Sequence, residues 1–95
     1  MAGTPKVDLD AVARLVDQLE QDLARVRAGG GSTETLRAEV EQLRALLGRD
    51  DASHGEVQAG LTGVRERLHA LTDEVVTDVV KSGDYLARIG RLLGL

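Results

Sequence analysis

Residues 73–95 read DEVVTDVVKSGDYLARIGRLLGL, and the surface that covers this stretch decides the fold. Residues 81–95 carry three Lys or Arg and one Asp, a net charge of +2, whereas residues 1–80 carry nine Lys or Arg and 15 Asp or Glu, a net charge of −6. An apolar and basic stretch in an acidic chain must pack against its own core, a partner helix or a membrane surface. Each of these alternatives implies a different function.

The composition points to a small helical domain. A chain of 95 residues makes one domain, residues 1–95, of a size at which a single core is only marginally stabilising. Its apolar residues are mostly Leu, Val and Ala, and Tyr85 is the only aromatic residue. Such residues suit helical stripes better than a β-sandwich. We therefore predict an all-α fold and expect oligomerisation to supplement the core.

Composition also disfavours several classes of protein. The chain has no cysteine, which excludes disulfides, thiolate metal sites and cysteine nucleophiles. No apolar run reaches the length of a signal peptide or the roughly 18 residues of a membrane span, so we expect a cytoplasmic protein. The net charge of −4 argues against nucleic acid as a partner.

The first two predicted helices cover about residues 8–28 and 33–47. Apolar residues recur in both at steps of three and four, which places them on one face of each helix. Asp8 or Asp10 can cap the first helix, and Ser32 or Thr33 the second, which Gly48 then ends. The loop between them contains GGGS at residues 29–32 and is short, so the two helices should form an antiparallel hairpin.

A third and longer helix is predicted over about residues 56–93. Ser53 and Glu56 have the spacing of a capping box at its start. The apolar stripe continues through Val57, Leu61, Val64, Leu68, Leu71, Val75, Val79, Leu86, Ile89 and Leu93. The run VVTDVV at 75–80 could form a strand, but its valines repeat at four and favour a helix. Gly60 and Gly63 weaken this helix, and a break near Gly83 stays open as an alternative.

The helix lengths predict an exposed surface. At about 1.5 Å per residue the third helix would span roughly 55 Å, against about 30 Å and 22 Å for the first two, so the hairpin can cover only half of it. The predicted fold is an antiparallel helical hairpin plus a longer C-terminal helix, as a three-helix bundle or a coiled-coil oligomer. The predicted interaction residues are Val79, Leu86, Ile89, Leu92 and Leu93, with Arg88 and Arg91 on the charged side. The alternative is a segment that packs on its own core.

Two clusters were considered as metal sites. Glu66 and His69 have the Glu-x-x-His spacing found in four-helix di-iron proteins, but they should project from the solvated side of the third helix. Asp50, Asp51 and His54 lie in a turn, where such residues are ordinary. We therefore predict no metal, and we find no residues placed as a general base, a nucleophile or a cofactor site.

These observations favour a non-enzymatic helical interaction or assembly protein. It would act through homo-oligomerisation or by docking on a helix of a partner protein. The alternative is a peripheral membrane-surface protein that uses residues 81–95 as an amphipathic basic helix. A small di-metal helical protein using Glu66 and His69 is a distant third.

Overall fold

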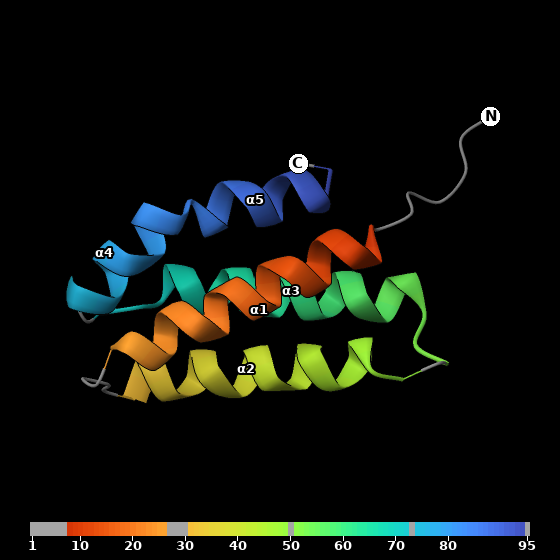
Figure 1. Cartoon of the computed structure of the whole chain (residues 1–95), viewed down its shortest axis with the longest axis horizontal. Coiled ribbons are helices and arrows are strands. Elements are labelled where there is room, and N and C mark those ends of the chain that lie inside the picture. The colour runs from red at the N-terminus through yellow and green to blue at the C-terminus, as the bar shows by residue number, and fades with distance from the viewer. Residues whose placement is uncertain (1–7, 27–30, 50, 73, 95) are drawn as a thin grey trace.

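The chain folds into helices alone throughout the part that the structure describes. The computed structural model describes residues 8–26, 31–49, 51–72 and 74–94, and these contain five helices and no strand. The helices are α1 (Leu9–Arg25), α2 (Gly31–Leu47), α3 (His54–His69), α4 (Glu74–Gly83) and α5 (Tyr85–Leu92) (Figure 1). The predicted all-α class is confirmed.

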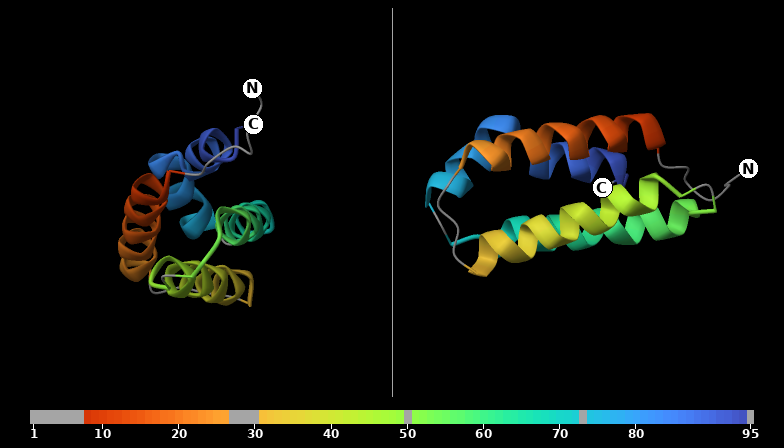
Figure 2. Two further views of the ribbon diagram at one scale, coloured as in Figure 1. Left: turned by 90° about the vertical axis from the view of Figure 1, so that its right-hand side faces the viewer. Right: turned by 60° about the horizontal axis from the view of Figure 1, so that its bottom comes forward.

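The helices form an antiparallel bundle in which α4 and α5 together take the place of a fourth helix. The chain runs along α1, back along α2, forward along α3 and back through α4 and α5 (Figure 1). α2 packs between α1 and α3, and α5 contacts both α1 and α3 on the other side of the core (Figure 2). We call α4 and α5, residues 74–92, the α4–α5 pair.

The predicted continuous helix over residues 56–93 is wrong, and so is the arrangement of a hairpin plus one longer helix. α3 ends at His69, the chain turns through Ala70, Leu71 and Thr72, and α4 begins at Glu74. A second break separates Gly83 from Tyr85. The reason is burial: by turning back, the chain covers the apolar faces of α1 and α3 with its own residues instead of leaving half of a long helix in water.

The predicted helix caps are confirmed at two of the three starts. The Asp8 carboxylate accepts a hydrogen bond from the Ala11 amide at 3.1 Å. Ser53 and Glu56 form a capping box, in which the Ser53 hydroxyl accepts from the Glu56 amide at 3.1 Å and the Glu56 carboxylate accepts from the Ser53 amide at 3.2 Å.

The boundaries of α1 and α2 differ slightly from the prediction. α2 begins at Gly31, ahead of the two residues predicted to cap it, and ends at Leu47 as predicted. The Ser32 hydroxyl instead lies 3.2 Å from that of Thr72, in the turn after α3. Residues 27 and 28 of the predicted first helix, and residues 29 and 30 of the glycine-rich loop, lie outside the described part of the chain.

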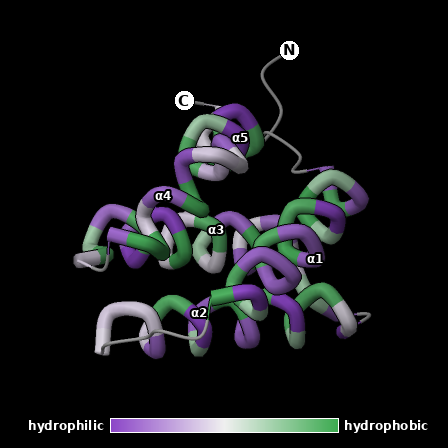
Figure 3. Tube along the Cα trace, turned by 60° about the vertical axis from the view of Figure 1, so that its left-hand side comes forward, coloured by the Kyte–Doolittle hydropathy of each residue, from purple (hydrophilic) through white to green (hydrophobic). Residues whose placement is uncertain are grey.

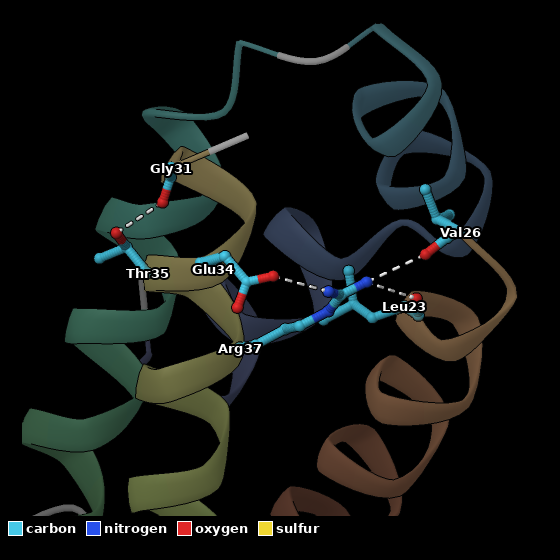
Figure 4. A network of polar contacts seen from close by, with 6 residues as sticks. All are labelled: Leu23, Val26, Gly31, Glu34, Thr35 and Arg37. Carbon is cyan, nitrogen blue, oxygen red and sulfur yellow. Dashed lines mark hydrogen bonds and ion pairs between the residues drawn. The ribbon is translucent and has the colours of Figure 1, made fainter. Parts of the chain in front are cut away.

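Arg37 fastens the end of α1 to the beginning of α2. Its guanidinium donates to the carbonyl oxygens of Leu23 at 3.2 Å and Val26 at 3.0 Å, and to the Glu34 carboxylate at 3.0 Å (Figure 4). The last carbonyls of a helix have no partner within the helix and carry partial negative charge. The Arg37 cation therefore satisfies these carbonyls and holds the α1–α2 hairpin closed.

Two glycines allow α2 and α3 to pack closely. A Cβ added at Gly60 would lie 2.9 Å from Cδ1 of Leu43, and one added at Gly63 would lie 2.8 Å from Oε2 of Glu39. Both contacts are shorter than a normal van der Waals separation. Gly60 thus weakens the helical pattern of α3 and fits α3 against the buried Leu43 of α2, whereas at Gly63 the mobile carboxylate end of Glu39 could move aside.

The core draws apolar residues from every helix, and hydrophobic and hydrophilic residues alternate along each of them (Figure 3). Its fully buried side chains include Leu19, Leu36, Leu61, Tyr85 and Ile89. One polar residue, Thr33, is completely buried with them, and its hydroxyl has no hydrogen-bond partner. A buried hydroxyl without a partner loses its hydration and gains nothing in exchange.

Thr33→Val should therefore raise the free energy of unfolding by about 1–2 kcal/mol, because it keeps the side-chain shape and removes the unsatisfied hydroxyl. Urea denaturation followed by circular dichroism measures the change. Thr35→Val is the matched control, since the exposed Thr35 hydroxyl donates to the Gly31 carbonyl at 2.8 Å. A destabilised Thr33→Val protein would show that the hydroxyl contributes more than its desolvation costs.

Candidate interaction surface

The predicted interaction residues lie on the α4–α5 pair, but they are not equally accessible. Ile89 is fully buried in the core of its own chain, so it offers no surface to a partner in this fold. Leu86, Leu92, Leu93 and Val79 are half-buried and pack against the same core. The premise that this whole stripe lies beyond the reach of the hairpin is wrong, because the chain turns back before α4.

The two predicted arginines both have intramolecular partners. The Arg88 guanidinium lies over the Tyr85 ring, 5.3 Å from its centroid, at a distance suited to a cation–π contact. Arg91 lies 3.6 Å from the Asp84 carboxylate, and both side chains are largely exposed. An exposed pair of this kind contributes little to stability, so Arg91 can exchange its partner at low cost.

α4 buries a different pair of valines from the predicted one. Val76 and Val80 are buried, whereas Val75, on the predicted stripe, is 58% exposed. Consecutive residues point about 100° apart on a helix, so the buried face of α4 is displaced by one residue from the predicted face. Both pairs in VVTDVV are valines four residues apart, so the sequence does not show which pair is buried. The tertiary contacts determine it.

Tyr85 is the central residue of this region. Its ring is fully buried, and a Cβ added at Gly83 would collide with the ring atoms. Its hydroxyl donates a hydrogen bond to the Asp22 carboxylate of α1. The predicted apolar stripe did not include Tyr85; its being the only aromatic residue of an otherwise aliphatic chain was the signal that could have identified it.

The backbone at Asp84 explains the break between α4 and α5. Asp84 has φ of 56° and ψ of 35°, a left-handed conformation that costs most residues free energy and that Asp tolerates better than most. The predicted alternative of a break near Gly83 is therefore confirmed. Gly83 leaves room for the Tyr85 ring, and the left-handed residue redirects the chain so that Tyr85 and Ile89 face the core.

A shallow groove lies between α5 and α1. Arg88, Arg91 and Leu92 line one side, and Ala11 and Leu15 line the other, around a volume of about 240 Å³. Apolar residues form part of its lining and two cations flank it. This is the place where the basic character of residues 81–95 meets an apolar surface.

The considered metal ligands do not come together. Glu66 and His69 are both exposed, as predicted from the stripe. Asp51 pairs with Arg49 at 3.1 Å, while Asp50 lies outside the described residues. Within the described ranges, no three His, Cys, Asp or Glu residues lie close enough to hold a metal ion. No helix in those ranges is both long and apolar enough to cross a membrane.

Comparisons with protein-family models, with curated proteins and with solved structures found no match to this chain.

The environment of Tyr85 predicts a specific response to alkaline pH. Burial raises the pKa of Tyr85 well above its ordinary 10.0, and the hydrogen bond to Asp22 and the negative charge of that carboxylate raise it further, against the opposing effect of Arg88 and Arg25. The folded chain thus holds the phenolic proton more tightly than the unfolded chain. Its stability should fall as pH rises above about 10, where the unfolded chain ionises first.

Tyr85→Phe should remove this component of the pH dependence and lower stability at neutral pH by about 1–2 kcal/mol through loss of the hydrogen bond. Ultraviolet absorbance of the single tyrosine reports its ionisation directly, in native buffer and in denaturant. Equal titration midpoints in the two conditions would contradict the buried, hydrogen-bonded phenol.

Proposed function

We propose that this protein is a non-enzymatic helical assembly protein that associates with a second copy of itself through the α4–α5 pair. The observation that carries the proposal is the exposure of Val75. At 58% it exceeds Leu9, at 42%, the other large apolar side chain that is exposed in the described residues. Burying one valine side chain contributes about 1.5 kcal/mol or more, so covering Val75 favours association.

The distribution of half-buried apolar residues supports the same surface. Six such residues pack partly against the core, and Leu47 is the member of this group outside residues 71–93; the others are Leu71, Val79, Leu86, Leu92 and Leu93. Among the described residues, five of the six half-buried apolar side chains that pack against the core therefore lie at positions 71–93. A second copy that packed there would bury them without any change in the α1–α2 hairpin.

A membrane-facing role is the second candidate, and the groove between α5 and α1 favours it. Arg88 and Arg91 flank that groove, next to Leu92, which combines positive charge with apolar surface. Interfacial helices bind anionic lipid through this combination. The groove is small, however, and Ile89 is committed to the core, so the apolar area available to a membrane is limited.

Val75→Asp should shift the association equilibrium toward the monomer by about tenfold or more, because a charge replaces the valine that association buries. Light scattering coupled to size-exclusion chromatography, over a range of micromolar concentrations, measures the mass. Leu9→Asp is the matched control, since Leu9 is also exposed but lies on α1. A wild-type chain that stays monomeric at every concentration would refute self-association.

Anionic vesicles test the second candidate with the same preparations. Replacing both Arg88 and Arg91 with Gln should weaken lipid binding by about 1 kcal/mol per charge and leave the mass in solution unchanged. Sedimentation with vesicles containing phosphatidylserine measures the bound fraction. Binding of the wild type, together with a monomeric mass, would favour the membrane over self-association.

A further inference from the structure

We infer that two copies associate by exchanging their α4–α5 pairs: the turn after α3 straightens, and each α4–α5 pair packs on α1 and α3 of the other copy. This inference rests on the proposed self-association and gives it a mechanism. In the exchanged dimer, α3 and α4 of each copy form one long helix.

The turn after α3 contains little that prevents it from becoming helical. No Gly or Pro occurs between Val64 and Ser82. The Ala70 amide donates to the carbonyls of Glu66 at 3.1 Å and Arg67 at 3.2 Å, and its φ of −86° and ψ of −1° lie beside the right-handed helical region. A helix could therefore continue through this turn without the usual penalties of glycine or proline.

The apolar pattern runs in phase across the same turn. Leu68, Leu71 and Val75 are separated by three and four residues, so they would share one face of a continuous helix. In the closed chain Leu68 is buried, Leu71 is half-buried and Val75 is exposed. At the crossing point of two such helices, Leu71 and Val75 of both copies lie near the twofold axis. The exchange would thus bury apolar surface of Val75 that is exposed in the closed chain.

The contacts of the α4–α5 pair can be reproduced by a second copy. The pair is held by its buried residues Val76, Val80, Tyr85 and Ile89 and by the hydrogen bond from Tyr85 to Asp22. The residues that receive these side chains, on α1 and α3, are identical in every copy. Exchange therefore keeps the contacts of the core and changes only the turn. The free-energy cost of exchanging an element is lowest when its contacts are the same in both states.

Among the described residues of this region, a polar contact between Ser32 and Thr72 opposes the straightening. The Ser32 hydroxyl of α2 lies 3.2 Å from the Thr72 hydroxyl, and it accepts a hydrogen bond from the Thr72 amide at 3.3 Å. This contact fixes the turn in its closed geometry and would be lost when the helix continues. Ser32 thus favours the monomer, and protein concentration favours the dimer, because association carries an entropic cost that concentration offsets.

Engineered cysteines distinguish exchange from simple side-by-side association, since the natural chain has no cysteine. Arg25 of α1 and Ser82 of α4 line the same groove. In the Arg25→Cys, Ser82→Cys double variant, a short bis-maleimide should join the cysteine of α1 to the cysteine of α4. In an exchanged dimer these two helices belong to different copies, so the reaction gives covalent dimers on a denaturing gel. In a closed chain they belong to the same copy, so the reaction gives internally linked monomers at every concentration.

The matched control joins two elements that the exchange leaves in one chain. Ala13 of α1 and Gly48 after α2 line another groove, so the Ala13→Cys, Gly48→Cys variant should give internally linked monomers in both states. Ser32→Ala, added to the Arg25→Cys, Ser82→Cys variant, should raise the fraction of covalent dimers several-fold at a fixed concentration. Insertion of three glycines after Thr72 should abolish the covalent dimers, because a long flexible turn lets each α4–α5 pair pack on its own chain.

The outcomes separate the two proposals. Covalent dimers that increase with concentration and with Ser32→Ala support exchange. A dimeric mass in solution with only internal links between residues 25 and 82 would overturn exchange and leave self-association standing. A monomeric mass at every concentration would overturn both.

Discussion

The packing of the Tyr85 ring over Gly83 is the contact on which the closed bundle depends. It requires a residue without a side chain at position 83 and a left-handed backbone at Asp84, and together these redirect the chain after α4. Only then do Tyr85 and Ile89 reach the core. The hydrogen bond from Tyr85 to Asp22 also fixes the α4–α5 pair at one position along α1.

Local features were predictable from the sequence, and tertiary choices were not. The capping box at Ser53 depends on residues three apart, so spacing identifies it, and the cap at Asp8 uses one of the two residues that the sequence offered. The prediction of a long third helix was wrong because Leu68, Leu71 and Val75 keep helical spacing across the turn. This spacing is the same whether the helix continues or the chain turns back. That decision depends on free energy gained far along the chain, at Tyr85 and Ile89.

The candidate surface shows the same division. The predicted interaction residues did not include Val75, which the structure exposes, and they included Ile89, which it buries in the core. The cause is the displacement of the buried face by one residue in VVTDVV, where both valine pairs have equal transfer free energy. A pattern of identical residues cannot reveal which pair a distant partner will cover. Gly60 likewise weakens a helix in isolation and fits it against α2 in the bundle.

The clamp at Arg37 has a consequence for the order in which the bundle assembles. Its contacts with the carbonyls of Leu23 and Val26 span 14 and 11 residues, whereas the contact between Asp22 and Tyr85 spans 63. Closing a short loop loses less chain entropy than closing a long one. Loop closure therefore favours formation of the α1–α2 hairpin before the α4–α5 pair packs on α1 and α3. If the bundle assembles in that order, the faces of α1 and α3 that the α4–α5 pair covers would be the last part of the core to close.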